Sequence, residues 1–263
     1  MLIAMDAGHG GKDPGAAANG LMEKDITLYL ALKAGAYLRT HYECDVMYTR
    51  NKDVYLGLSE RANIANRAKA DLFCSFHINS FNSTSKGFET YCYPGTTGKT
   101  VELQKAIHEE VMKVLKPYDI TDRGMKQKDL AVVRQTSMPA ILTETLFISN
   151  PNEAKLLKSA SFLDKVAEAH AIGIAKAAGL AKKNSSSTYL MTIAFKNKAE
   201  ADKHAKQLKE QYGWLVDVKK SEGLCQYGGD FFRTIKILHN PVMSDFLFCV
   251  EPVLARVDTS FFQ

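Results

Sequence analysis

The sequence Leu2-Ile-Ala-Met-Asp-Ala-Gly-His-Gly-Gly-Lys-Asp-Pro-Gly15 joins a short apolar segment to a glycine-rich loop. Leu2–Met5 is a predicted buried strand, and the loop behind it carries His9, where glycines allow the backbone to approach a ligand closely. Beyond the loop, apolar residues recur at helical spacing: Ile26, Tyr29, Leu30, Ala34, Tyr37 and Leu38. A strand followed by a helix predicts that an α/β domain begins here.

The alternation of strands and helices continues along the chain. Strands are predicted near residues 45–49, 72–76, 87–93 and 140–142. Helices are predicted after Ser59, over Leu103–Leu115 up to a break at Pro117, and over residues 152–158 and 162–178. Strands separated by helical crossovers predict a mostly parallel central sheet flanked by helices on both faces.

Four polar residues stand at positions where such a sheet would bring them together. His9, His77 and Glu144 follow apolar strands, and Glu23 lies in a turn before a helix. The carboxyl ends of parallel strands meet at one edge, which is where ligands bind. Two histidines and one carboxylate form a catalytic zinc set, and a second carboxylate can serve as the base.

Each of these residues also has a structural interpretation when taken alone. His77 could be a packed or capping histidine, Glu23 a helix-start carboxylate and Glu144 a surface turn residue. The catalytic interpretation depends on all four together.

The segments around these residues resemble the zinc-dependent N-acetylmuramoyl-L-alanine amidases of the Amidase_3 family. The matching segments are DAGHGGKDPGA at 6–16, NGLMEKD at 19–25, TRNKDVYLGLSERANIAN at 49–66, ADLFCSFHINS at 70–80 and MPAILTETLFISNPNEAKLL at 138–157. The resemblance covers residues 1 to about 180 and implies hydrolysis of the amide bond between N-acetylmuramic acid and L-alanine in bacterial peptidoglycan.

Carried over residue by residue, the resemblance makes His9, Glu23 and His77 the Zn2+ ligands and Glu144 the catalytic base. Three protein ligands leave a fourth zinc position for water. Asn79 is a further candidate that orients substrate or caps a turn. Arg50 and Arg61 could equally pair with structural carboxylates. The other histidines are assigned to the surface or the core: His41, His108, His170, His204 and His239.

Composition sets outer limits on function. The chain has 263 residues, 46% hydrophobic and 24% charged, which is typical of a globular protein with a sizeable core. Its formal charge of +5 comes from dispersed residues, so no basic stripe for nucleic acid is present. Five separated cysteines without a CxxC pair predict buried free thiols: Cys44, Cys74, Cys92, Cys225 and Cys249.

The start of the chain lacks the features of a secretory signal, and no apolar run is long enough to span a membrane. These features predict synthesis in the bacterial cytoplasm without a signal peptide, no insertion into the membrane, and action on the cell wall after release. Two settings fit this: a phage endolysin let through the membrane by a holin, which we favour, or a sporulation amidase freed when the mother cell lyses.

The sequence predicts a change of domain after Leu180. Residues 181–188 are polar and predict a linker, and residues 189–263 predict a small α+β domain. Its strand at Tyr189–Phe195, helix at Lys198–Tyr212 and strand at Trp214–Val218 resemble half of a SPOR domain, a glycan-binding module. The resemblance weakens after Gly223, so wall binding stands beside a structural or oligomerising role.

Two other functional classes compete with the amidase. A zinc peptidase cutting within the stem peptide would usually carry a compact HxxE ligand pair, whereas His9 and Glu23 lie farther apart. A wall-binding protein without activity would be expected to have lost a ligand or Glu144, and all four residues are present.

Overall fold

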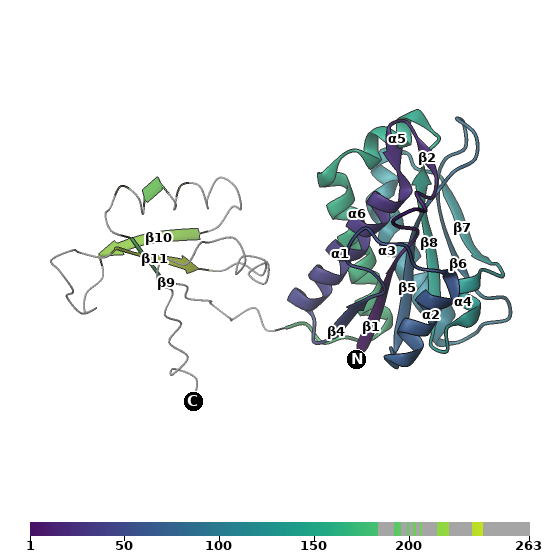
Figure 1. The fold of residues 1–263 in the computed structure, drawn as a ribbon, viewed down its shortest axis with the longest axis horizontal. Helices are drawn as coiled ribbons and strands as arrows, with labels where there is room; N and C mark the ends of the chain where they lie inside the picture. Colours follow the sequence, from purple (N-terminus) through teal and green to yellow (C-terminus); the bar gives the residue numbers. More distant parts are fainter. Residues whose placement is uncertain are drawn as a thin grey trace. The chain divides into compact units, whose positions relative to one another are not determined.

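The computed structural model describes residues 1–183, 192–195, 199, 202–203, 206, 215–220 and 233–238. The chain divides into two compact units, Met1–Lys183 and Asn184–Gln263 (Figure 1). The first unit contains all four candidate site residues.

A six-stranded sheet forms the centre of the first unit, in the order β4-β1-β5-β8-β6-β7. The strands are β1 (Leu2–Ala7), β4 (Asp45–Tyr48), β5 (Leu72–Asn79), β6 (Phe88–Cys92), β7 (Asp122–Gln127) and β8 (Ala140–Phe147). Strands β4, β1, β5 and β8 are parallel to one another, as expected. Strand β6 is antiparallel to β8, and β7 is parallel to β6, so the sheet is mostly parallel, as predicted.

Helices cover both faces of the sheet, as the alternation predicts (Figure 1). They are α1 (Glu23–His41), α2 (Leu58–Arg67), α3 (Lys99–Leu115), α4 (Ala131–Gln135), α5 (Pro151–Leu157) and α6 (Ala160–Ala177), with a 3-10 turn, η1 (Lys116–Tyr118), after α3. Helices α1, α3 and α6 pack together on one face, and α2 packs with α4 on the other. The core is therefore split into two layers.

Side chains that alternate in direction along each strand fill both layers of the core. Ile3 and Met5 of β1 enter the larger layer under α1 and α6, whereas Ala4 between them enters the smaller layer with Phe73 and Leu142. Successive side chains of a strand point to opposite faces, so each strand contributes to both layers.

A two-residue turn fixes where α1 starts. Asn19 and Gly20 have φ values of 53° and 74°, the left-handed conformation that such hairpin turns require. They join the short strands β2 (Ala17–Ala18) and β3 (Leu21–Met22), and α1 begins directly afterwards at Glu23. The turn therefore places a candidate ligand at the first residue of a helix.

The sequence also predicts the state of the cysteines and histidines of the first unit and the start of α2. Cys44, Cys74 and Cys92 are free thiols, and the last two are buried. His170 and His108 are buried and donate to or accept from groups inside the unit. Helix α2 begins at Leu58 with Gly57 as its N-cap, whereas the sequence predicted a start after Ser59.

The second unit contains a three-stranded antiparallel sheet in the order β10-β11-β9. Its strands are β9 (Thr192–Phe195), β10 (Leu215–Lys220) and β11 (Arg233–Leu238). Most of the predicted helix at Lys198–Tyr212, together with His204, His239, Cys225 and Cys249, lies outside the described residues.

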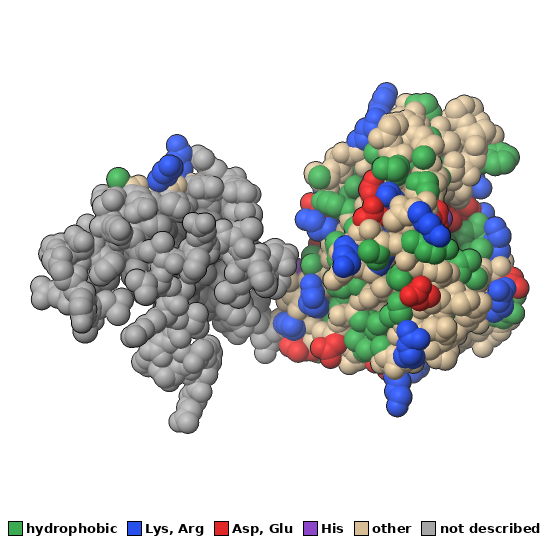
Figure 2. All heavy atoms as spheres, in the orientation of Figure 1, with side chains coloured by type: hydrophobic (Ala, Val, Ile, Leu, Met, Phe, Trp, Pro, Cys, Tyr) green, Lys and Arg blue, Asp and Glu red, His purple; other side chains and the backbone are tan. Residues whose placement is uncertain are grey.

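The surface of the first unit is mixed in charge. On the face in Figure 2, Lys and Arg side chains are dispersed among polar and apolar groups rather than gathered in a stripe. Within the described part of the chain, no helix has the length and hydropathy needed to cross a bilayer.

Candidate metal centre

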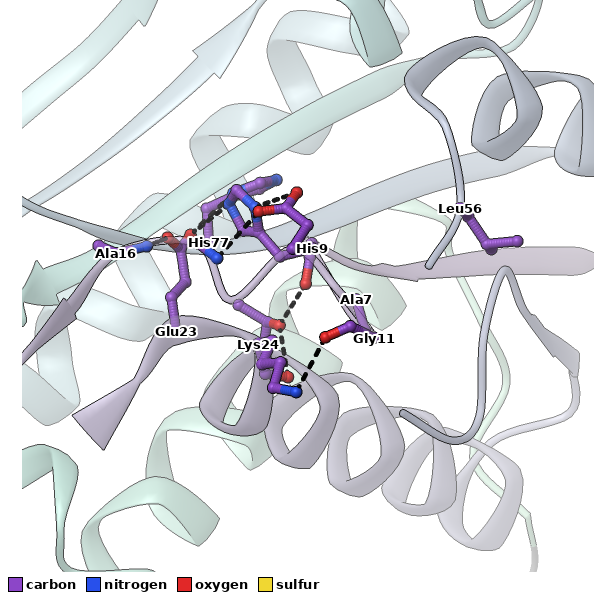
Figure 3. Close-up of polar contacts among 12 residues, drawn as sticks. Ala7, His9, Gly11, Ala16, Glu23, Lys24, Leu56 and His77 are labelled. Atoms are coloured by element: carbon purple, nitrogen blue, oxygen red, sulfur yellow. Dashed lines mark hydrogen bonds and ion pairs between the residues drawn. The ribbon is translucent and has the colours of Figure 1, made fainter. Parts of the chain in front are cut away.

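His9, Glu23 and His77 converge at the carboxyl end of the sheet. His9 follows β1, Glu23 opens α1, and His77 lies near the end of β5. Figure 3 shows the three side chains pointing toward one another. Because β1 and β5 are parallel neighbours, their carboxyl ends lie side by side and the two imidazoles meet, with ring centres 4.9 Å apart.

Glu23 is the centre of this cluster and is 4% exposed. Its Oε1 lies 3.2 Å from Nε2 of His9 and 2.9 Å from Nδ1 of His77. Backbone amides hold both carboxylate oxygens: Ala16 N–H donates to Oε2 at 2.8 Å and Ile78 N–H donates to Oε1 at 3.0 Å. The carboxylate is thus fixed before any ligand arrives.

The spacing of these donor atoms fits a zinc ion. One ligand atom from each of the three residues lies within 4.8 Å of the other two. Zinc bonds of 2.0–2.2 Å in a tetrahedron place ligand atoms about 3.4 Å apart. Two imidazole nitrogens and one carboxylate oxygen are also the donor types of catalytic zinc sites.

The loop that carries His9 is held by its own side chains. His9 has a φ of 60°, which is unfavourable for a residue with a β-carbon. Asp13 accepts a hydrogen bond from Nδ1 of His9 at 2.9 Å and one from the Gly15 amide at 3.0 Å. With Nδ1 donating to Asp13, Nε2 is the nitrogen that could bind a metal once it has lost its proton.

Two buried arginines anchor the backbone of the same loop. Arg61 pairs with the fully buried Asp6 at 3.0 Å and donates to the carbonyls of Ala7 and His9. Arg50 donates to the carbonyls of Ala7 and Gly8 at 2.9 Å each. Arg61 therefore has a carboxylate partner, whereas Arg50 mainly binds backbone oxygens.

The three candidate ligands shift one another's pKa. Burial opposes a charge on His9, but its hydrogen bond to Glu23 and that carboxylate's charge outweigh burial and raise the pKa of His9 to about 9. His77 is also raised in pKa, since Glu23 again outweighs burial. Burial opposes ionisation of Glu23, yet the two histidines hold its pKa far below the usual range.

Glu144 lies within β8, not at the end of a strand as the sequence suggested, because β8 continues to Phe147. It stands directly opposite His77 of β5. Its buried Oε2 has no hydrogen-bond partner among the described residues. Burial raises the pKa of Glu144 to about 7, with the charge of His77 acting in the opposite direction.

A pocket of about 290 Å³ opens above these groups. His9, His77 and Glu144 line it, together with Asp13 and Arg61. Its walls are largely apolar and come from the segment leading into α2, the start of α4 and strand β8: Tyr55, Leu56, Leu58, Leu130, Ala131, Val132 and Leu142. Apolar walls around a few polar groups are typical of a pocket that binds a substrate and orients it for reaction.

Asn79 lies two residues beyond His77 and donates from Nδ2 to Glu89 of β6 at 2.6 Å. Sequence reasoning did not single out Glu89 or Asp13. Asp13 stands in the same glycine-rich loop as His9, and a carboxylate that can orient a metal-binding histidine is the signal that could have identified it.

The fold and the cluster define a class. Two histidines and a carboxylate that could hold a metal ion, beside a buried carboxylate whose pKa is near 7, are the groups that metal-dependent hydrolases use.

Comparison with known proteins specifies this class further. The family profile described as N-acetylmuramoyl-L-alanine amidase matches residues 3–176. The endolysin of Bacillus phage SPP1 is 53% identical over 188 residues, which are 71% of this chain and 69% of that protein. The sporulation-specific N-acetylmuramoyl-L-alanine amidase of Bacillus subtilis strain 168 is 43% identical over 204 residues, 77% of this chain and 78% of that protein.

A solved structure agrees with these relatives. The catalytic domain of CwlV, an N-acetylmuramoyl-L-alanine amidase from Bacillus (Paenibacillus) polymyxa var. colistinus, is 33% identical with a TM-score of 0.64, covering 68% of this chain and 99% of that domain. The chain belongs to the N-acetylmuramoyl-L-alanine amidase family, Amidase_3, whose members are hydrolases of the amide between glycan and stem peptide in peptidoglycan.

Proposed function

We propose that this chain is a zinc-dependent lytic amidase in which His9, Glu23 and His77 hold the metal and Glu144 moves the proton. The observation that carries the proposal is the convergence of the three donor residues within 4.8 Å beside the unpartnered Oε2 of Glu144. When bound, zinc would supply Lewis acidity, acidifying water and polarising the scissile carbonyl.

The protein's own groups would then position the substrate and transfer protons. Asp13 fixes the ring of His9, and two backbone amides fix the carboxylate of Glu23, so the donor set needs little rearrangement. Apolar walls around the pocket exclude bulk water and strengthen electrostatic interactions inside it.

Glu144 is suited to accept a proton and return it. A carboxyl with a pKa of about 7 is present in both protonation states at neutral pH, which is the optimum for a general acid–base group. In the proposed cycle its Oε2 takes a proton from the attacking water and then delivers it to the departing amine of the first stem-peptide residue, alanine.

The biological setting we propose is lysis by a phage endolysin, with release through a holin. The supporting observation is the 53% identity to the endolysin of Bacillus phage SPP1. The sporulation amidase of Bacillus subtilis, at 43% identity, supports mother-cell lysis as the second setting.

Digestion of purified sacculi tests the reaction directly. We expect mass spectrometry to find free stem peptides beginning with alanine, released by the wild-type protein with zinc and lost after chelation. Glu144→Gln keeps the size of the side chain but cannot accept the proton, so we expect zinc binding to persist and turnover to fall at least 100-fold, as for loss of a general base.

Two outcomes would contradict the proposal at different points. Cuts only within the stem peptide, despite bound zinc, would identify a peptidase. Near-normal turnover by Glu144→Gln would be compatible with amidase activity but would show that Glu144 is not the base.

A further inference from the structure

A charged cluster lies beside Glu144 on the pocket face of the sheet. Glu89 of β6 is directly opposite Glu144 of β8. Side chains at directly opposite positions share a face, with Cβ atoms about 5 Å apart. Tyr91, two residues after Glu89, packs in the same smaller core layer as Leu142, which also lines the pocket. The two strands therefore extend the floor of the pocket sideways.

Glu89 binds Asn79, Arg123 and Lys126 at this point, and a hydrogen bond with Tyr91 also lowers its pKa. Its side chain is 3% exposed. Its Oε1 accepts the hydrogen bond from Asn79, and its Oε2 accepts one from Nε of Arg123 at 2.9 Å and one from the Lys126 ammonium. One carboxylate facing two cations leaves the cluster with a net positive charge.

The two cations are only partly covered. The side chains of Arg123 and Lys126 are 35% and 39% exposed, although the carboxylate beneath them is buried. Arg123 also lies over the Phe147 ring, 4.9 Å from its centre. Helix α3 packs on β6 and β7 from the opposite face, in the layer of Phe88 and Leu103. The cations are thus held in fixed positions on an open surface, which lowers the entropy lost when an anion binds.

The direction of the substrate follows from the role of Glu144, so this step rests on the proposed function. If Glu144 protonates the departing amine, the peptide leaves on the β8 side of the three ligands. Consecutive residues are 3.8 Å apart at Cα, and neighbouring strands are about 4.8 Å apart. The residue after alanine then lies over β6, beside Arg123 and Lys126.

We propose that Arg123 and Lys126 form a subsite for the free α-carboxylate of the second stem-peptide residue. In peptidoglycan this residue is a glutamate joined to the next residue through its side-chain carboxyl, which leaves the α-carboxyl either free or amidated. Glu89 and Asn79 are positioning residues that hold the two cations. The subsite therefore distinguishes walls whose stem glutamate is free from walls in which it is amidated.

The test uses the full-length protein and two soluble muropeptides that differ only in this group, carboxylate or amide. We expect the wild-type protein to have a kcat/KM at least tenfold higher for the carboxylate form, since a charge-assisted hydrogen bond gives about that factor. Lys126→Gln and Arg123→Gln should each reduce this preference severalfold, mainly through KM of the carboxylate form. Arg123→Lys keeps the charge and should retain most of the preference.

Lys128→Gln is the matched control. Lys128 directly follows β7, its ammonium lies 5.7 Å from the centre of the Tyr91 ring, and the substitution removes the same charge. We expect its preference to equal that of the wild type. Equal kcat/KM for both muropeptides in the wild type, or an unchanged preference in both Gln variants, would overturn the subsite. Failure to release alanine-terminated peptide from either muropeptide would instead overturn the proposed function.

Discussion

At the scale of single residues, His9 has a strained backbone conformation at a position where its ring can reach the candidate metal site. Its φ of 60° costs roughly 1–2 kcal/mol for a residue with a β-carbon. Asp13 and Arg61 bind its ring and its carbonyl respectively and stabilise that conformation. Backbone strain of this kind, offset by surrounding contacts, is concentrated at functional sites.

Protons and zinc compete for the same nitrogens, so metal affinity should depend on pH. The pKa of His9 is raised to about 9 and that of His77 is raised as well, so at neutral pH binding must displace protons. We expect the apparent zinc affinity to fall as pH is lowered from 8 to 6, by about tenfold per pH unit for each displaced proton. Competition with a chelator of known pH dependence measures this.

Glu144→Gln serves as the control for that titration. Glu144 also changes charge near pH 7, and the variant removes that change while keeping both histidines. It also removes the Glu144 charge that helps to raise the pKa of His77, whereas Glu23 still raises the pKa of both histidines. The slope should persist in the variant. An affinity that does not change between pH 6 and 8 would show that the histidines are already neutral in the metal-free protein.

Sequence patterns singled out the three proposed ligands and the proposed base but not the residues that support them. His9, Glu23, His77 and Glu144 were found because their residue types carry the chemistry and their segments resemble a family. Glu89 has no such signal, because its importance comes from strand pairing with Glu144, which no periodicity records.

At the scale of elements, the loop between β1 and α1 depends on the absence of a side chain at Gly8. A Cβ at this position would lie 2.4 Å from Cε1 and 2.6 Å from Nε2 of His77. We therefore expect Gly8→Ala to displace the His77 ring and weaken zinc binding by about 10–100-fold, the range seen when metal ligands lose their support. Isothermal calorimetry of the metal-free protein measures the loss.

Gly57→Ala is the control for this substitution, because a Cβ there meets nothing within 4 Å. Its zinc affinity should match that of the wild type. If Gly8→Ala binds zinc normally while circular dichroism shows a native fold, the contact between Gly8 and His77 does not determine the geometry of the site.

The strands and helices with clear hydrophobic periodicity were predicted, and the polar or short ones were not. Strand β7 reads Asp-Arg-Gly-Met-Lys-Gln and helix α4 has five residues, so neither shows a pattern. The sequence analysis assigned no direction to β6, although a signal existed. Strand β5 ends at Asn79 and β6 starts at Phe88, a connection too short for a parallel crossover of a dozen residues or more.

At the scale of the whole molecule, the structure supports a cut after Lys183 rather than after Leu180. Residue Lys182 pairs with Tyr42, the Glu43 amide donates to the Ala181 carbonyl, and the Lys183 amide donates to the His41 carbonyl. We expect residues 1–183 to hydrolyse soluble muropeptides at the full-length rate and to bind whole sacculi at least several-fold more weakly. Co-sedimentation with sacculi measures the binding.

A matched measurement separates targeting from oligomerisation. If the second unit joins copies of the chain, light scattering should give a smaller assembly for residues 1–183 than for the full chain. Unchanged sacculus binding by the shorter chain would contradict wall targeting by residues 184–263.

The predicted boundary after Leu180 lies close to the division after Lys183, because the polar serine-rich stretch that follows cannot bury itself. The sequence left the role of the second unit open, since its resemblance weakens after Gly223 and the three described strands form a common small sheet. The fold of the first unit was more predictable because strands buried on both faces leave strong apolar runs.

Strand β7 carries Arg123 and Lys126 and is also the outer edge of the central sheet. An edge strand presents unpaired backbone groups to any other strand, and charged side chains hinder such pairing between molecules. Replacing both cations by apolar residues, to relax the choice of substrate, would therefore also leave the edge less protected from aggregation. In the proposed subsite, the choice of substrate and the protection of the sheet edge therefore depend on the same two side chains.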